Sequence, residues 1–242
     1  MSAEGGRVVI VTGASRGIGR AIAVELSRAG ESVVAVARTA RDLEETLRFM
    51  EEVRPAGSAA RHSIHIADVT RESEVEALFR GAAERYGRVD VLVNNAGHVD
   101  PVGILEMTLE NWTHTLATNL TAAFLCTREF VRANKRVGGK IINIASTAGL
   151  TPRPGWSAYA AAKAGLINFS LTMSEELKPY GIKVYCVAPG RTATELRQKL
   201  APEEDPATIL QPAAVGRLVR LLVSPEGDYI DQQTIVIRKP LP

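Results

Sequence analysis

The sequence predicts an α/β fold in which seven parallel strands form one doubly wound sheet with helices on both faces. Short runs of apolar, β-branched residues recur along the chain, and segments of helical length separate them. Runs that are apolar at consecutive positions are typical of strands buried on both faces, as in a parallel sheet between helices. The expected strands span residues 7–12, 32–37, 62–66, 89–94, 140–145, 183–188 and 233–238.

The composition indicates one domain and excludes several classes of partner. The 242 residues contain no linker or repeat that divides them, so we expect a single domain over residues 1–242. The 29 basic and 27 acidic residues are spread along the chain, which disfavours nucleic acid or a membrane surface as partner. Four scattered histidines give no metal-ligand spacing. Because Cys126 and Cys186 lie in apolar runs and the N-terminal apolar run is too short for a signal peptide, we expect a cytoplasmic protein with buried thiols.

The first expected strand runs into TGASRGIGRAIAVEL, which places Gly13, Gly17 and Gly19 at a strand-to-helix turn. Glycines there permit a tight bend and a close approach of the backbone to a pyrophosphate, and N–H groups at a helix start point at the anion. The motif predicts a dinucleotide-binding loop. The alternative is a purely structural turn between the strand and its helix.

Two arginines favour NADP(H) over NAD(H). A site for NAD usually carries an acidic residue at the end of the second strand, where it holds the ribose 2′-hydroxyl. Here that strand ends at Arg38, and Arg16 lies within the glycine loop. Guanidinium groups attract a 2′-phosphate, which gives the preference for NADP(H). The alternative is that Arg38 is a solvated residue at the start of a helix.

The stretch SAYAAAKAGLI separates Tyr159 from Lys163 by three alanines. Alanine is the best helix former, so both side chains should lie on one helix face, one turn apart. A lone pair of this kind is usually an ordinary helix surface. Its significance depends on the motifs around it.

The chain carries, in order, the motifs TGASRGIG, NNAG at 94–97, Asn119, Ser146, YAAAK and Pro189–Gly190. Together these motifs resemble those of the classical short-chain dehydrogenases/reductases, and most closely the 3-oxoacyl-(acyl carrier protein) reductases. They occur in the family's order over nearly the whole chain, and a set of motifs is far more specific than any one. The resemblance implies a single-domain Rossmann fold, an oxidoreductase acting on CH–OH or ketone groups, and a homo-oligomer, either a tetramer or a dimer.

The resemblance also implies roles for individual residues. Asp68 and Val69 resemble the adenine contacts, and the segment from Asn94 to Gly97 resembles the support of the nicotinamide ribose. Alternatively, Asp68 caps a helix that begins near Thr70, and Asn94 closes a strand-end turn. The full set of cofactor-binding residues implied is Gly13, Ser15, Arg16, Gly17, Ile18, Gly19, Arg38, Asp68, Val69, Asn95, Ala96, Gly97, Tyr159, Lys163, Pro189, Gly190, Thr192 and Thr194.

The implied chemistry is the reduction of a ketone by hydride transfer from NADPH, with Tyr159 as the proton donor. A phenol is a poor acid near neutrality, and a nearby Lys163 ammonium should lower its pKa. Ser146 would bind the substrate oxygen and hold it near Tyr159. By resemblance, Asn119 helps to hold a water that relays protons to Lys163. The catalytic set is therefore Asn119, Ser146, Tyr159 and Lys163.

The substrate and the partners are less determined. A 3-oxoacyl thioester is expected from the resemblance, and a carbonyl, polyol or diketone substrate is the alternative, as is a non-catalytic NADP-binding sensor. Residues 192–212, interrupted by prolines, predict a short substrate lid. His98 either touches the substrate or is an ordinary loop histidine. Arg128, Arg132, Lys135 and Arg136 form either a docking face for an acidic carrier protein or a solvated helix face.

The C-terminal end departs from the family pattern. Asp231 and Gln232 stand where a Thr-Gly pair is common, and Arg238, Lys239 and Pro240 replace terminal glycines. In the family this tail usually borders subunit contacts, so the departure affects the expected oligomer interface.

Overall fold

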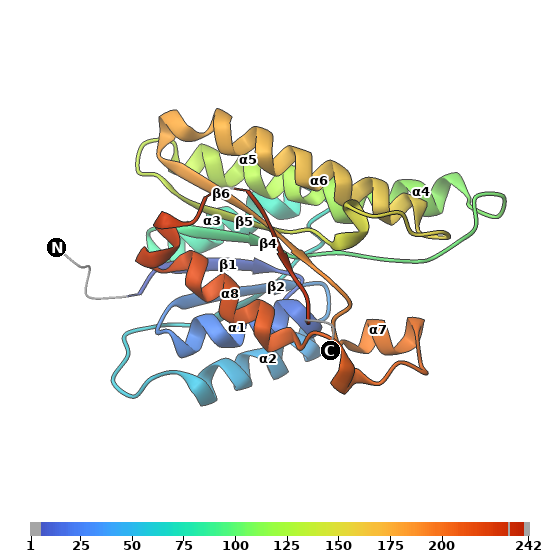
Figure 1. Cartoon of the computed structure of the whole chain (residues 1–242). Coiled ribbons are helices and arrows are strands. Elements are labelled where there is room, and N and C mark those ends of the chain that lie inside the picture. The colour runs from blue at the N-terminus through green and yellow to red at the C-terminus, as the bar shows by residue number, and fades with distance from the viewer. Residues whose placement is uncertain (1–5, 232, 240–242) are drawn as a thin grey trace.

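The chain folds around a seven-stranded parallel sheet in the order β3-β2-β1-β4-β5-β6-β7, as predicted (Figure 1). The computed structural model describes residues 6–231 and 233–239. The strand order reverses between β1 and β4, which is the switch point where a doubly wound sheet binds ligands. The strands are β1 (Val8–Thr12), β2 (Ser32–Ala37), β3 (Ser63–Ile66), β4 (Val91–Asn94), β5 (Gly139–Ile144), β6 (Ile182–Pro189) and β7 (Thr234–Ile237).

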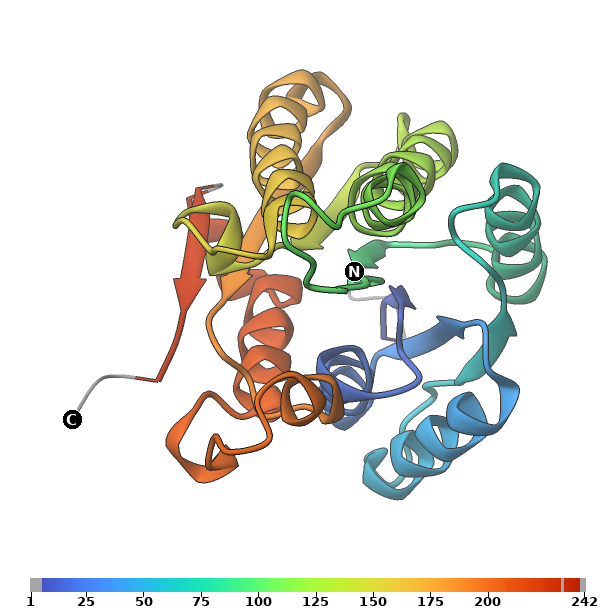
Figure 2. The same cartoon turned by 90° about the vertical axis from the view of Figure 1, so that its right-hand side faces the viewer.

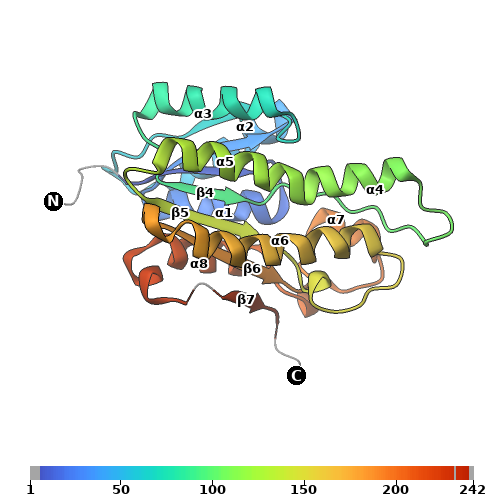
Figure 3. The ribbon, with the colours of Figure 1, turned by 90° about the horizontal axis from the view of Figure 1, so that it is seen from above.

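Helices cover both faces of the sheet, as Figure 2 shows in a view roughly along the strands. On one face lie α1 (Gly17–Arg28), α2 (Ala40–Val53) and α8 (Pro212–Val223). On the other lie α3 (Glu72–Tyr86), α5 (Ala122–Asn134) and α6 (Ser157–Glu176). A single π-helical turn (Ala117–Thr121) joins α4 (Leu109–Leu116) to α5, and α4 runs beside α6 (Figure 3).

The strand residues alternate between two cores because successive side chains point to opposite faces of a sheet. Val9 and Val11 pack with α1 and α8, whereas Val8 and Ile10 pack with α3 and α5. Both predicted thiols, Cys126 and Cys186, are free and buried. In the described part of the chain, no helix combines the length and the apolar character needed to cross a membrane.

The segment predicted as a lid contains α7 (Glu195–Leu200) and a 3₁₀ turn (Pro206–Thr208). A β-bridge between Thr192 and Leu210 holds its two ends together. Inside it, Glu204 accepts hydrogen bonds from Arg191 and Arg197. The segment therefore forms a closed loop beyond the carboxyl end of β6, and the ion pairs of Glu204 lie inside this loop.

The C-terminal residues that depart from the family pattern lie beside this loop. Arg238 packs against Gly190, where an added Cβ would be 3.0 Å from the Arg238 Cβ. The Lys239 ammonium donates a hydrogen bond to the Ala207 carbonyl. Gln232 and Pro240, named among the same departures, lie outside the described residues.

A series of buried side-chain hydrogen bonds links β4, β5 and α6 below the site. The Asn94 amide donates to Thr127 Oγ1 at 3.2 Å and to Asn143 Oδ1 at 2.8 Å. Asn143 in turn donates to Ser170 Oγ at 2.9 Å. Buried amides need such partners, because an unpaired polar group in a core costs free energy.

We expect Asn143→Ala to lower the free energy of unfolding by about 1–3 kcal/mol, because it removes the hydrogen-bond partner of the buried Asn94 amide. Chemical denaturation measures this change. Asn168→Ala, at an exposed position of α6, is the matched control and should have little effect. Equal stability of the two variants would contradict a stabilising role for these hydrogen bonds.

Candidate active site

The glycine loop closes against the segment that follows β4. Gly13 and Gly17 have positive φ values of 64° and 55°, which favour glycine. A Cβ on Gly13 would lie 2.8 Å from the Ala96 Cα, and one on Gly19 would lie 2.2 Å from the Gly13 carbonyl oxygen. Side chains at these positions would therefore force the loop open.

Thr12 and Asn95 hold this contact together. Thr12 Oγ1 accepts hydrogen bonds from the backbone N–H groups of Asn95 at 3.0 Å and Ala96 at 3.1 Å. The Asn95 amide donates to the carbonyls of Thr12 and Gly13. Thr12 was not among the predicted site residues, although it directly precedes the first glycine of the motif.

The start of α1 is suited to an anion. Its first turn has no acidic side chain, and Arg16 at the N-cap makes no side-chain cap. N–H groups at such a helix end are free to bind a phosphate. The residues present therefore fit a dinucleotide pyrophosphate.

Arg16 and Arg38 are both exposed beside this loop. Arg16 lies 3.9 Å from Glu195 of α7, a surface ion pair that constrains it weakly. Arg38 is close enough to Asp68 to help lower that carboxyl's pKa, which also falls because Thr70 donates two hydrogen bonds to it against the opposing effect of burial. Asp68 does not cap a helix, the alternative considered from the sequence, because α3 begins at Glu72 with Arg71 at its N-cap. It orders the turn before α3 and lines the cleft.

One cleft of about 330 Å³ collects most of the predicted residues. It runs from Arg38 and Asp68 past the glycine loop to Tyr159 and Lys163. Ser146, Pro189, Gly190 and Thr192 do not line it. The predicted residues that do are Gly13, Ser15, Arg16, Gly17, Ile18, Gly19, Arg38, Asp68, Val69, Asn95, Ala96, Gly97, Asn119, Tyr159, Lys163 and Thr194.

Asn119 lies in the π-helical turn between α4 and α5 and is buried. Its amide donates to the carbonyls of His98 at 2.6 Å and Thr115 at 2.9 Å, and its Oδ1 accepts from the His98 N–H. π-helical turns inside α-helices are frequent at functional sites. The side chain therefore fixes the loop after β4 against the long helix.

Tyr159 is half-buried on the first turn of α6. Burial raises the pKa of its phenol, while a hydrogen bond with the Ser146 hydroxyl and the nearby Arg153 act in the opposite direction. The net direction is upward because desolvation outweighs the effects of Ser146 and Arg153. The lowering by Lys163 expected from the sequence stays a prediction. Ser146 caps a 3₁₀ turn by accepting from the Ala148 N–H, which holds its hydroxyl beside Tyr159.

Lys163 is 3% exposed, and its ammonium donates to the Ile144 carbonyl at 2.9 Å. The same Nζ lies 5.7 Å from the centroid of the Tyr159 ring. Burial lowers the Lys163 pKa to about 8. The residue is thus a buried amine that titrates close to neutrality.

Several lining residues were not predicted. His98, left open from the sequence, lines the cleft and packs edge-on against His114 with 4.8 Å between ring centroids. Asp42 also lines the cleft, near Arg38. No sequence motif marks Asp42, because its place in the cleft depends on how α2 packs. The other unpredicted lining residues are Val36, Ala37, Thr39, Ala67, Thr70, Val99, Thr118, Ile144, Ala145, Glu195 and Leu196.

Metal ligands do not gather in the described residues: no three His, Cys, Asp or Glu side chains meet in a group that could hold an ion.

Comparison with known proteins places this geometry in a family. The model of the short chain dehydrogenase family matches residues 7–205. A 3-oxoacyl-[acyl-carrier-protein] reductase of Synechocystis sp. is 38% identical over 244 residues, covering 97% of this chain and 96% of that protein. An NADPH-dependent aldehyde reductase-like protein of Arabidopsis thaliana is 35% identical, covering 96% and 93%.

Solved structures agree. The crystal structure of a variant of actinorhodin polyketide ketoreductase with NADPH is 31% identical, with a TM-score of 0.87 over 98% of this chain and 97% of that one. The family match, the sequence relatives and the shared fold lead to one conclusion: the chain belongs to the short-chain dehydrogenase/reductase family and is an oxidoreductase acting on a ketone or the corresponding alcohol.

Proposed function

We propose that the protein reduces a ketone to a secondary alcohol with NADPH, and that Tyr159 donates the proton. The observation that carries this proposal is that Tyr159 and Lys163 line the same cleft as the glycine loop, with the Ser146 hydroxyl bonded to Tyr159. A nicotinamide cofactor in this cleft would supply the hydride.

Each of the four residues has a distinct part in the proposed reaction. The Tyr159 phenol, kept protonated by its raised pKa, gives its proton to the developing alkoxide. Ser146 holds the substrate oxygen at Tyr159. Lys163 carries the positive charge next to the phenol, and Asn119 keeps the adjoining backbone in place for a water that returns the proton.

The preference for NADP(H) rests on Arg16 and Arg38. Both guanidinium groups are exposed at the adenosine end of the cleft, and Arg38 has no hydrogen bond or ion pair within the described residues. Asp42 lines the same end and would repel a phosphate, so the two cations have to outweigh one carboxylate. The names of the Arabidopsis relative and the ketoreductase structure, which both mention NADPH, support the preference.

We further propose that the whole chain acts as one dinucleotide-binding and catalytic domain with residues 192–212 as its lid. Thr194, Glu195 and Leu196 line the cleft from the lid side. Thr192 buries its side chain and donates to the Gly190 carbonyl at 2.9 Å. The lid is thus anchored directly after β6.

A 3-oxoacyl thioester is the substrate class that the Synechocystis relative's name supports. A small carbonyl compound is the second candidate. A non-catalytic sensor is disfavoured because Asn119, Tyr159 and Lys163 line one cleft and Ser146 forms a hydrogen bond with Tyr159.

We expect Tyr159→Phe to lower kcat for ketone reduction by at least about 100-fold, because it removes the proton donor. Cofactor binding, measured by titration of NADPH fluorescence, should remain. Tyr180→Phe, at a 43% exposed position, is the matched control and should retain activity. Full activity of Tyr159→Phe would contradict the proposed mechanism.

We expect Arg38→Gln to raise the Kd for NADPH by about 10-fold or more and to leave NADH binding unchanged, because a charge-assisted contact to the 2′-phosphate is lost. Arg41→Gln, an exposed arginine outside the cleft, is the control. Equal weakening of both cofactors, or no change, would refute the role given to Arg38.

The buried Lys163 predicts a pH dependence. Because its pKa is lowered to about 8, the ammonium persists below that pH and is lost above it. The kcat for reduction should therefore fall as the pH rises through this value, while Tyr159, with a raised pKa, stays protonated. A pH–rate profile at saturating NADPH measures this, and a flat profile across this range would oppose the assignment.

A further inference from the structure

The segment between Ser146 and Tyr159 places a cation beside the proposed proton donor. Residues Arg153 to Trp156 read R-P-G-W, and the Trp156 N–H donates to the Arg153 carbonyl at 3.1 Å across a four-residue turn. Gly155 in this turn has a φ of 77°, and proline followed by a glycine of positive φ is the signature of a type II turn. The turn folds Arg153 back over the residue that precedes α6.

The Trp156 ring contacts both the Arg153 guanidinium and the Tyr159 ring. The Arg153 guanidinium carbon lies 5.7 Å from the centroid of the Trp156 ring. Trp156 meets Tyr159 edge-on, with 5.7 Å between ring centroids. Because Trp156 and Tyr159 are three residues apart at the start of a helix, they share a face. A single indole ring therefore separates the cation from the phenol.

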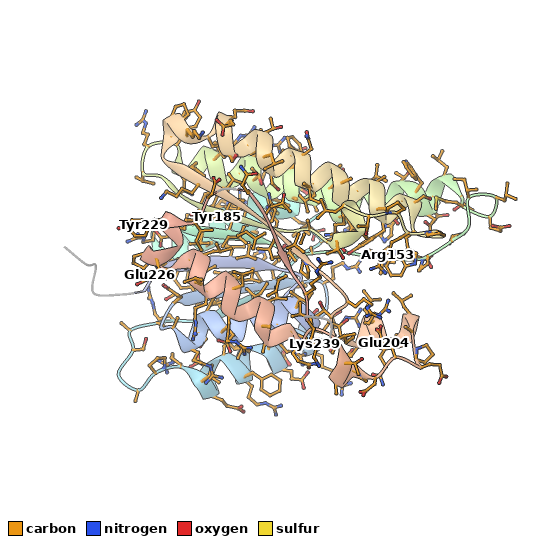
Figure 4. All side chains as sticks on the ribbon, in the orientation of Figure 1. Arg153, Tyr185, Glu204, Glu226, Tyr229 and Lys239 are labelled. Atoms are coloured by element: carbon orange, nitrogen blue, oxygen red, sulfur yellow. The ribbon has the colours of Figure 1, made fainter. Side chains whose placement is uncertain are left out.

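The turn is fixed to the protein at a second point. The Gly155 carbonyl accepts a hydrogen bond from the Val102 N–H at 2.9 Å, which ties it to the loop after β4. The helix then begins where the Ala160 N–H donates to the Trp156 carbonyl at 2.8 Å. Arg153 is thus held on a defined scaffold at the carboxyl end of the sheet (Figure 4).

The Arg153 charge has no carboxylate partner within residues 6–231 and 233–239, although its side chain is half-buried. Glu204, which lies at the same end of the molecule in Figure 4, is already paired with Arg191 and Arg197. Arg153 also does not line the cofactor cleft, whose basic side chains are Arg16, Arg38 and Lys163. A free guanidinium in this place is available for an anion other than the cofactor.

We propose that Arg153 binds a carboxylate or phosphate group of the substrate, and that the protein prefers ketones whose anionic group lies only a few bonds from the carbonyl. This inference rests on the proposed ketone reduction and narrows its substrate class. The short path from Arg153 through Trp156 to Tyr159 does not suit an anion at the far end of a long thioester arm.

The test compares two matched pairs of ketones in the full-length protein with NADPH: acetoacetate with methyl acetoacetate, and dihydroxyacetone phosphate with dihydroxyacetone. The two pairs distinguish a carboxylate from a phosphate. In the pair whose anionic ketone the wild type prefers, Arg153→Gln should lower kcat/KM for that anionic ketone about 10- to 100-fold. It should change kcat/KM for the neutral ketone of the same pair little. Arg153→Lys should restore part of the loss. Arg217→Gln, at an exposed position of α8 outside the cleft, is the matched control and should change neither.

The outcomes separate this inference from the proposed function. A wild type that reduces neutral ketones as well as anionic ones, or an Arg153→Gln variant that loses both equally, overturns the anion-binding role and leaves ketone reduction standing. Weakened NADPH binding in Arg153→Gln also overturns it, because the cation would then serve the cofactor. If the wild type binds NADPH but reduces neither these compounds nor acetoacetyl thioesters, both the proposed function and this inference are refuted.

Discussion

The close contact between the glycine loop and the segment after β4 is the constraint on which the site depends. Gly13 and Gly19 allow backbone to pack on backbone, and Thr12 with Asn95 fastens the two segments by hydrogen bonds. This contact bridges the switch point between β1 and β4, where the strand order reverses. It fixes the floor of the cleft, and the anion-binding end of α1 and the long helix bearing Asn119 are positioned relative to it.

Burial tunes the groups that do the proposed chemistry. The phenol of Tyr159 and the ammonium of Lys163 are both desolvated, which raises the pKa of the first and lowers that of the second. Desolvation disfavours the charged form of each group, so the two pKa values are pushed towards a protonated phenol and an amine that titrates near pH 8. The proposed proton donor and a buried amine then lie one helical turn apart, in contact with Ser146 and the Ile144 carbonyl respectively.

The segments that we propose to select the substrate lie outside this framework. The R-P-G-W turn sets Arg153 over Trp156 beside Tyr159, and the proposed lid contributes Thr194, Glu195 and Leu196 to the cleft. The C-terminal tail reaches the lid through Lys239.

Periodicity and short motifs in the sequence predicted the seven strands, their parallel arrangement and which residues form the glycine loop. These features are predictable because buried strands and tight turns each require particular residue types. The α6 helix and the burial of both cysteines followed in the same way. Only the tertiary structure decided the direction of the Tyr159 pKa, the cleft positions of Asp42 and His98, and the absence of Ser146 and Thr192 from the cleft lining. Those properties depend on solvent exposure and on contacts between distant segments, which spacing along the chain does not encode. Arg153 illustrates both sources of information. Four consecutive residues specify its turn, whereas only the folded structure shows that its guanidinium has no carboxylate partner among the described residues.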